Sequence, residues 1–390
     1  MSKNTSCIPS FRLNIAALRA IVLLCISSSL VFSNISWAQK PTQEEITNLI
    51  EKLNTNDELE LKDTVREFRK IGKDAVPTLV KTALKNENLQ VQISAKHILE
   101  SSNHEIVADE LIKTFGSTDL KFRRRAIKWF NEISWNLELK AAKFVPQLIK
   151  LLEDEDNDVR QSAASALGRI GEKAATYEAI KALAKLLGDE DNDVRSSAAN
   201  ALAAMGKKAA TYEAIKALAK LLEDEDVFLR QNAIYALNRM GERAATDEAI
   251  KALAKILNDK DSDVRKNAIY ALKSMGEKAA TDEVIKALTK LLSEKDSDVL
   301  RNAANALAAM RERAATDEVI KELTKLLNNK DSNVRGSDAN VYALAAMGER
   351  AATDEVVKIL IKLLNDKNVF IRRSAAKTLG AMGERAATDE

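Results

Sequence analysis

Residues 191–206, DNDVRSSAANALAAMG, and residues 261–276, DSDVRKNAIYALKSMG, are two copies of one phrase. Apolar residues stand at offsets 0, 4, 7, 8 and 11 from the valine, at Val194, Ala198, Ala201, Leu202 and Met205. This spacing predicts one buried stripe on an amphipathic helix. The first aspartate predicts an N-cap, and the last glycine predicts a left-handed residue that ends the helix.

A second phrase precedes each copy, for example ATYEAIKALAKLL at 175–187. Its threonine predicts an N-cap, and the acidic residues that follow suit the positive end of a helix. Ile180, Leu183, Leu186 and Leu187 form its apolar stripe. The threonine recurs 35 residues apart, then once after 37 and again after 35, at Thr176, Thr211, Thr246, Thr281, Thr316, Thr353 and Thr388. We assign the step of 37 to a two-residue insertion at Gly336-Ser337-Asp338.

The two phrases together predict a helical hairpin, which cannot bury its stripe alone. Stacked hairpins bury their stripes against one another and form a solenoid. We therefore expect an all-α protein, a right-handed α-α superhelix of about ten helix pairs. Residues 39–140 are interpreted as degenerate N-terminal repeats that act as a cap, and residues 141–390 as regular repeats with a 35-residue period.

The pattern D-x-D-V-R-x-x-A-A-x-A-L-x-x-x-G resembles HEAT repeats, an armadillo-like helical class, and in particular the bacterial subtype named after phycobilisome lyases. The resemblance is strong from residue 141 onward and weaker over GKDAVPTL, residues 72–79. It implies an α-solenoid in which the repeat arginine is generally structural. Arg311 in place of the terminating glycine and Leu300 in place of the repeat arginine depart from the pattern.

The first 38 residues have the three parts of a secretory signal peptide. These are the basic Lys3, Arg12 and Arg19, an apolar stretch from Ala20 to Phe32, and Ser36-Trp37-Ala38. Because the apolar stretch is shorter than the roughly 20 residues that cross a bilayer, it predicts a cleaved signal and not an anchor. We expect a periplasmic or secreted protein with no stable membrane insertion after cleavage near Ala38.

Cleavage would remove both cysteines, Cys7 and Cys25, and change 60 basic against 58 acidic residues to 57 against 58. A strongly basic nucleic-acid footprint is therefore absent, and no nucleic-acid partner is expected. Disulfides, thiolate nucleophiles and cysteine–zinc sites are excluded. With no cysteine and no suitable histidine, the usual nucleophilic arrangements cannot be assembled. We expect a protein that is not an enzyme and needs no cofactor.

Metal sites also find little support in the sequence. Acidic turns such as EDEDND at 153–158 are similar to calcium loops, but Val159 stands where such a loop needs glycine. We interpret these carboxylates as helix caps. Deoxyhypusine hydroxylase, an enzyme with HEAT-like repeats, binds two irons through several His-Glu pairs, whereas this chain has only His104-Glu105, expected in a linker. His97 is interpreted as a partly buried surface residue, and no metal is expected.

In most repeats an arginine follows the valine of the D-x-D-V-R pattern, which we call the repeat valine. These arginines either bind anionic ligands or pair with Asp158, Asp193, Asp263 and their equivalents in adjoining units. We favour the structural interpretation. The ladder comprises Arg160, Arg195, Arg230, Arg265, Arg335 and Arg372.

The residue six places after the repeat valine lies about 240° round the helix, away from the core stripe. The expected concave face of the solenoid therefore carries Ser165, Asn200, Tyr235, Tyr270, Asn305, Tyr342 and Lys377. Because tyrosine is favoured in interfaces, the five Tyr and Asn residues are candidate protein-binding residues. Repeat drift at a tolerant solvent position is the alternative.

Three hypotheses of function follow. The first is an exported, non-enzymatic scaffold that binds a protein or peptide along the concave face. The second comes from the resemblance, which implies bilin lyases that attach or detach a tetrapyrrole, although export separates the chain from such intracellular substrates. The third is a self-assembling structural spacer, a homo-oligomer formed through the C-terminal repeat, which ends at Gly383 without a dedicated cap.

Overall fold

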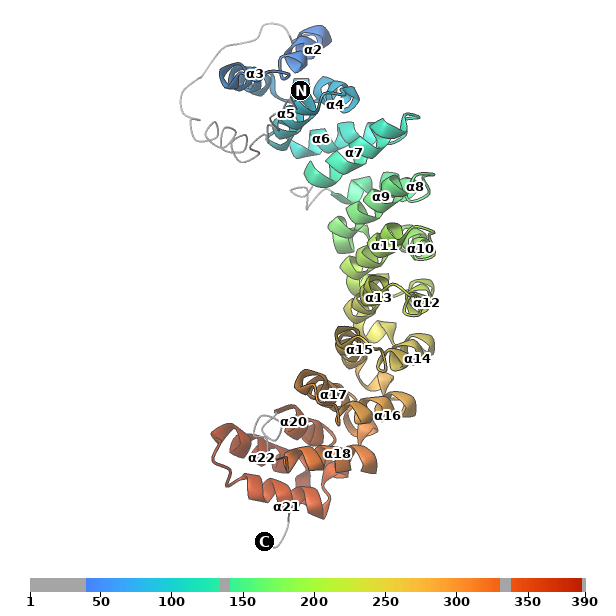
Figure 1. Cartoon of the computed structure of the whole chain (residues 1–390), viewed down its shortest axis with the longest axis vertical. Coiled ribbons are helices and arrows are strands. Elements are labelled where there is room, and N and C mark those ends of the chain that lie inside the picture. Colours follow the sequence, from blue (N-terminus) through green and yellow to red (C-terminus); the bar gives the residue numbers. More distant parts are fainter. Residues whose placement is uncertain (1–39, 134–140, 330–337, 388–390) are drawn as a thin grey trace, which may run out of the picture. The chain divides into compact units, whose positions relative to one another are not determined.

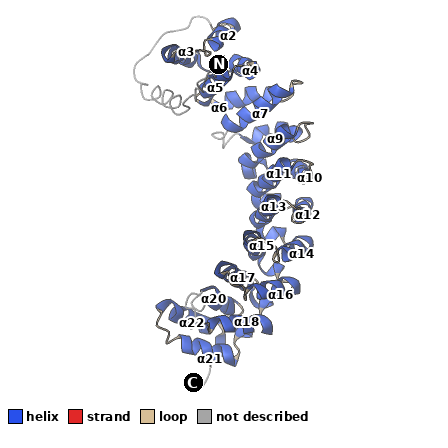
Figure 2. Ribbon diagram, in the orientation of Figure 1, coloured by secondary structure: helices blue, strands red, loops and turns tan. Residues whose placement is uncertain are grey.

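The computed structural model describes residues 40–133, 141–329 and 338–387, in which every regular element is an α-helix or a short 3-10 helix (Figures 1 and 2). The α-helices form ten consecutive pairs in these ranges, which confirms the predicted all-α superhelical repeat fold. The expected signal peptide, Arg335, residues 336–337 of the insertion and Thr388 lie outside the described residues. The chain divides into two compact units, residues 1–137 and 138–390.

Unit 1 contains three helix pairs in its described part. The helices are α2 (Gln43–Glu51), α3 (Glu58–Ile71), α4 (Val76–Lys85), α5 (Leu89–Glu100), α6 (His104–Lys113) and α7 (Leu120–Ile133). α4 packs against α2 and α6, and α5 packs against α3 and α7. The aromatic residues Phe122, Trp129 and Phe130 are buried, and the ring of Phe130 meets that of Phe115 edge-on at 5.7 Å. These aromatic side chains therefore belong to the core of unit 1.

Unit 2 contains seven helix pairs arranged in two rows (Figure 1). The first-helix row comprises α8 (Val145–Leu151), α10 (Tyr177–Leu186), α12 (Tyr212–Leu221), α14 (Asp247–Ile256), α16 (Asp282–Leu291), α18 (Asp317–Leu327) and α21 (Asp354–Leu363). The second-helix row comprises α9 (Asn157–Ile170), α11 (Asn192–Met205), α13 (Val227–Met240), α15 (Ser262–Met275), α17 (Ser297–Ala309), α20 (Asp338–Ala346) and α22 (Val369–Ala381). Each helix packs on its neighbours in the same row and on its own partner.

The core of unit 2 lies between the two rows. The predicted stripe of α11, from Val194 to Met205, is at most 1% exposed at each of its five positions. The repeat methionines are also fully buried, at Met205, Met240, Met275, Met310, Met347 and Met382. Burial of one such side chain stabilises the fold by about 1.5–3 kcal/mol, so the repeated stripe supplies the main favourable term.

The helix ends follow the predicted capping chemistry. Thr246 Oγ1 accepts a hydrogen bond from the amide of Ala249 at 3.3 Å, and Asp261 Oδ1 accepts one from the amide of Val264 at 3.0 Å. The same N-cap is present at Thr176, Thr211, Thr281, Thr316 and Thr353. Each cap satisfies an amide that has no partner inside its own helix.

The terminating glycines differ from the prediction in one respect. Gly206 has the expected positive φ of 58°, but its ψ of −136° is far from the value of about +47° in a left-handed helix. The chain therefore leaves α11 through an extended glycine conformation and enters a 3-10 turn, Gly206–Ala209. This turn leads directly to Thr211, the N-cap of α12.

Candidate functional site

Three tyrosines project from the second-helix row, which lies on the inner side of the curve of unit 2 (Figure 1). Tyr235 on α13, Tyr270 on α15 and Tyr342 on α20 are 53%, 44% and 62% exposed. At the same repeat position, Asn200 and Lys377 are exposed, whereas Ser165 and Asn305 are half-buried. We call these seven residues the inner track.

Hydrogen bonds join neighbouring second helices along the inner track. The Tyr270 hydroxyl donates to Asn302 Oδ1 on α17 at 3.2 Å. Asn232 Nδ2 on α13 donates to Ser196 Oγ on α11 at 2.8 Å. The bond to Asn302, which is only 6% exposed, orients the phenol ring of Tyr270 while leaving much of it accessible.

Two further aromatic side chains lie on this row and were not among the predicted residues. Phe228 on α13 is 70% exposed, and Phe370 on α22 is 65% exposed. Phe228 precedes Tyr235 by seven residues, so the two side chains share one face of α13 across about two turns. The sequence held a signal for this exposure. In other repeats the position of Phe228 is occupied by an aspartate, Asp193 or Asp263, which is typical of a solvent-facing position.

The arginine ladder lies at the turn edge of unit 2 and connects successive repeats. Arg160 Nε donates to Asp189 Oδ2 at 2.8 Å, while its Nη1 donates to the carbonyl oxygens of Asp154 and Glu155. The later arginines form ion pairs of the same kind, Arg195 with Asp224, Arg230 with Asp259 and Arg265 with Glu294. Each guanidinium therefore joins its own acidic turn to the next one.

These partners differ from the expected ones. The predicted partners were Asp158, Asp193, Asp263 and their equivalents, which stand just before the repeat valines. The structure instead supplies the acidic residue that opens the following turn, 29 residues after the arginine in the pair of Arg160 with Asp189. Arg372 also donates to the carbonyl oxygen of Asp366 in its own turn, at 2.8 Å, and Arg335 lies outside the described residues.

The ion pair of Arg160 and Asp189 is nearly buried, with side chains 11% and 9% exposed. The hydrogen bond with Asp189 raises the pKa of Arg160 above its usual value. Burial raises the pKa of Asp189, but the hydrogen bonds from Arg160 and from the amide of Asp191, together with the charge of Arg160, hold that pKa below its usual value. Both groups are therefore charged at neutral pH and hold the turn together.

The acidic turns use their carboxylates to cap helices. Asp156 Oδ1 accepts from the amide of Val159 at 3.2 Å, and Asp154 Oδ1 accepts from the amide of Asp156 at 3.1 Å. Hydrogen bonding by Asn157 and by the amide of Val194 holds the pKa of Asp191 below its usual range. In the described ranges, no group of three or more His, Cys, Asp or Glu side chains is placed to hold a metal ion.

The two histidines both lie near Glu100, at the end of α5. His97 Nδ1 is 3.0 Å from Glu100 Oε2, and His104 Nε2 is 2.8 Å from the carbonyl oxygen of Glu100. The expectation that His104 lies in a linker was wrong, because it is the first residue of α6 and follows the N-cap Asn103. The signal was present, since asparagine before a helix is a strong N-cap.

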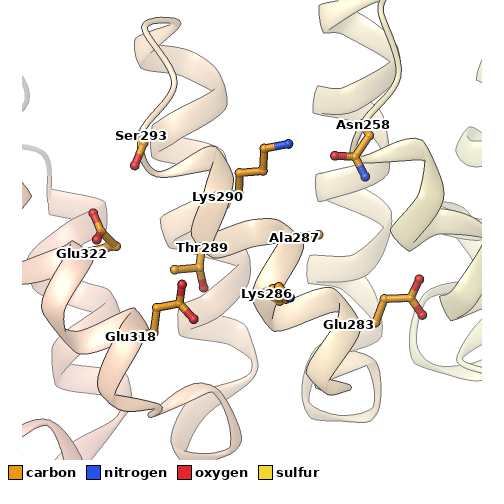
Figure 3. A pocket seen from close by; sticks show the side chains of 9 residues that line it. All are labelled: Asn258, Glu283, Lys286, Ala287, Thr289, Lys290, Ser293, Glu318 and Glu322. Atoms are coloured by element: carbon orange, nitrogen blue, oxygen red, sulfur yellow. The ribbon is translucent and has the colours of Figure 1, made fainter.

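A depression of about 440 Å³ lies on the first-helix row (Figure 3). Lys286 and Lys290 of α16 line it together with Glu318 and Glu322 of α18. Thr289 is buried there, and its hydroxyl donates to the carbonyl oxygen of Ile285 at 2.6 Å. Opposite charges alternate across this depression, so it offers neither a single sign of charge nor an apolar floor.

In the portion of the chain that the structure describes, no helix is long and apolar enough to cross a membrane.

The chain is similar to a known family of repeats and to solved structures of engineered proteins. A family model for HEAT repeats matches residues 145–212, 180–273, 215–306, 250–340 and 337–390. An engineered protein solved by the Northeast Structural Genomics Consortium is 25% identical, with a TM-score of 0.56 and coverage of 94% of this chain and 98% of that chain. A second engineered protein from that consortium is 24% identical over 63% of this chain and 99% of its own, with a TM-score of 0.41. No curated protein matches the chain. Because the HEAT-repeat model covers more than half of the residues, the chain belongs to the HEAT-repeat family.

Proposed function

We propose that this HEAT-repeat protein is an exported, non-enzymatic scaffold that binds a protein partner along the inner track of unit 2. The exposure of Tyr235, Tyr270 and Tyr342 at one repeat position carries the proposal. Tyrosine presents a large, rigid contact area and a hydroxyl, and it is enriched in interface hot spots. Phe228, exposed on the same face as Tyr235, adds apolar surface.

The spacing of the track suits an elongated partner. Packed helices lie about 8–10 Å apart, so Tyr235 and Tyr270 on neighbouring helices offer contacts at roughly that interval. A helix or extended segment laid across the second-helix row can contact several repeats at once. Solenoids commonly bind partners in this way, along an extended concave surface.

The chain offers a matched control for this proposal. All five of its tyrosines lie in unit 2, and Tyr177 and Tyr212 project from the first-helix row with 60% and 56% exposure. The ammonium groups of Lys181 and Lys216 lie over these two rings at 5.9 and 5.8 Å. Tyr177 and Tyr212 thus share residue type and exposure with the track but lie on the other row.

The test is crosslinking in the native host, followed by mass spectrometry and by pull-down of the identified partner. Replacing Tyr235, Tyr270 and Tyr342 by alanine is expected to weaken capture at least tenfold, since each hot-spot tyrosine contributes about 1–2 kcal/mol. Replacing Tyr177 and Tyr212 by alanine is expected to leave capture unchanged. Equal recovery with both variants would remove the inner track as the binding site.

We also propose that the chain is exported through residues 1–38 and works in the periplasm or outside the cell. The basic leader, the apolar stretch and Ser36-Trp37-Ala38 support this. The N-terminal sequence of protein recovered from the periplasm or medium is expected to start at Gln39. Recovery of the uncleaved chain in the cytoplasm would contradict the proposal.

Self-assembly is a second candidate function, because the last described helix pair exposes apolar side chains. Leu364 is 36% exposed, whereas Leu327, at the same position one repeat earlier, is fully buried. Val369 and Phe370 are 56% and 65% exposed beside it. Light scattering across a concentration range, with Phe370→Asp as the variant, tests this candidate, and a monomer at every concentration would remove it.

The finer assignment, to the repeat subtype named after phycobilisome lyases, rests on the D-x-D-V-R pattern. If the chain belongs to that subtype, a lyase-like activity on a bilin is the alternative to the non-enzymatic proposal. Absorbance spectra of the purified chain mixed with a bilin separate the two. A changed spectrum would contradict the non-enzymatic proposal, and an unchanged one is expected.

A further inference from the structure

A basic groove lies in unit 1 between α5 and α7, a surface that the proposed function does not use. The groove has a volume of about 420 Å³. Its basic lining residues are Lys96, Lys121, Arg124, Arg125 and Lys128, against a single acidic one, Glu132. Four of the five basic residues come from one helix, α7.

Lys96 and Arg125 hold the helices around the groove together. Lys96 Nζ pairs with Glu132 across the groove. Arg125 Nη1 donates to the carbonyl oxygens of Leu84 and Asn86, the latter at 2.9 Å, and so satisfies the C-terminal end of α4. These contacts join α5 and α7 to each other and to α4.

Lys121, Arg124 and Lys128 are exposed and form a column on one face of α7. Their spacing of three and four residues places them about 4.5 Å and 10.5 Å along the helix axis from the first. Within the described residues, neither Lys121 nor Lys128 has an ion-pair partner. The column therefore presents the ammonium groups of Lys121 and Lys128 to solvent about two turns apart, with the exposed Arg124 between them.

Apolar groups lie beside this column. Leu89, in the first turn of α5, is 67% exposed, and Ile93 one turn later is half-buried. Trp129 is 5% exposed and forms part of the groove wall. A ligand in the groove meets hydrocarbon from α5 on one side and cations from α7 on the other.

We propose that this groove binds an acidic, amphipathic segment of a partner protein. A helix with carboxylates three and four residues apart matches the steps of Lys121, Arg124 and Lys128, and its apolar residues cover Leu89 and Ile93. Helix-in-groove recognition of this kind reads side chains at steps of three and four residues. Charge complementarity also favours the correct register and speeds association.

Nucleic acid and membrane surfaces fit the groove less well. Residues 40–137 contain as many acidic as basic side chains, so the positive field is confined to the groove and does not form the extended basic stripe of a nucleic-acid binder. Membrane-surface helices insert exposed aromatic side chains, whereas Trp129 is buried in unit 1.

The experiment titrates the purified chain against a labelled helical peptide with glutamates at i, i+3 and i+7 and leucines on the adjoining face, and against its glutamine twin. We expect the glutamate peptide to bind at least tenfold more tightly, with an affinity that falls as salt screens the exposed charges. The triple variant Lys121→Gln, Arg124→Gln, Lys128→Gln is expected to lose that tenfold preference.

A matched triple, Lys251→Gln, Lys286→Gln, Lys321→Gln, removes the same charge from the exposed first-helix row and is expected to keep the preference. Equal binding of both peptides, or an equal loss with both triples, overturns the proposal. So does tighter binding of single-stranded DNA or of vesicles rich in phosphatidylglycerol that disappears only with the α7 triple. Leu89→Ala isolates the apolar contribution, because it removes exposed hydrocarbon without adding charge. We expect this variant to bind the glutamate peptide more weakly while unit 1 stays folded.

Discussion

At the scale of single residues, Arg311 stands out by its backbone. Among the described residues it is the one non-glycine residue with a positive φ, 52°. It occupies the repeat position that holds Gly206, Gly241 and Gly276, whose φ values are 58°, 63° and 64°. The Arg311 side chain makes only an exposed ion pair, in which its Nε lies 3.3 Å from Glu277 Oε1. The fold of the neighbouring repeats thus imposes a glycine conformation on an arginine.

We predict that Arg311→Gly stabilises the protein by about 1 kcal/mol. A residue with a Cβ in this region costs roughly 1–2 kcal/mol, which exceeds the value of an exposed ion pair. Thermal or urea unfolding measures the change. Arg313→Gly, in the same turn but without a positive φ, is the control and is expected to destabilise the protein slightly. A less stable Arg311→Gly variant would refute the strain argument.

The pair of Arg160 and Asp189 predicts a pH dependence. The pKa of Asp189 is lower in the folded protein than its usual 3.8, so the folded state favours the carboxylate. Its contribution is therefore complete above pH 3.8 and is lost as the pH falls through the lower, folded pKa. Asp189→Asn is expected to cost about 1–3 kcal/mol at pH 7 and progressively less below pH 3.8.

Unfolding curves of wild type and Asp189→Asn at a series of pH values check this. Asp193→Asn, which changes an exposed carboxylate four residues later, is the control and should shift stability less. A stability difference between wild type and Asp189→Asn that does not shrink in acid would show that the ion pair does not set the contribution.

At the scale of elements, neighbouring second helices approach closely where their residues are small. A Cβ added to Gly168 on α9 would lie 3.1 Å from Ala201 Cα on α11. Gly380 holds the same repeat position on α22, where an added Cβ meets nothing within 4 Å. The same residue type thus has a packing role in one repeat and none in another.

We predict that Gly168→Leu destabilises the protein by about 1–3 kcal/mol, because the larger side chain forces α9 and α11 apart. Gly380→Leu is expected to be neutral or stabilising, because leucine favours a helix more than glycine does. Chemical denaturation of both variants tests the pair. Equal destabilisation at both positions would contradict the close packing of α9 on α11.

At the scale of the whole molecule, unit 2 is stabilised by contacts between adjacent helix pairs. α13 packs on α11 and α15 within its row, whereas α22 packs on α20 alone among the described second helices. In such a linear array, stability is close to a sum of repeat and nearest-neighbour terms. The pair α21–α22 therefore has fewer stabilising contacts than the pair α12–α13.

We predict that amide hydrogen exchange is fastest in α21 and α22 and slowest in α12 to α15. Local opening needs less free energy where only one neighbouring pair covers the apolar stripe. Exchange measured by mass spectrometry on peptides from each helix checks this order. Uniform protection along unit 2 would mean that the repeats unfold as one cooperative body.

The helices, their caps and their buried faces could all be predicted from short stretches of sequence. Thr246, Asp261 and the stripe from Val194 to Met205 lie as predicted, because capping and helical periodicity depend on residues a few places apart. The same helical periodicity predicts that the sixth residue after the repeat valine faces away from the core. The exposed tyrosines at that position could therefore be predicted.

The side-chain contacts between repeats became known from the packing of the folded chain. Arg160 pairs with Asp189 and not with Asp158, and α7 brings its basic column beside Leu89 of α5. These contacts depend on the rotation and displacement between successive hairpins. Those quantities arise from the packing of whole helices, and no short stretch of sequence encodes them.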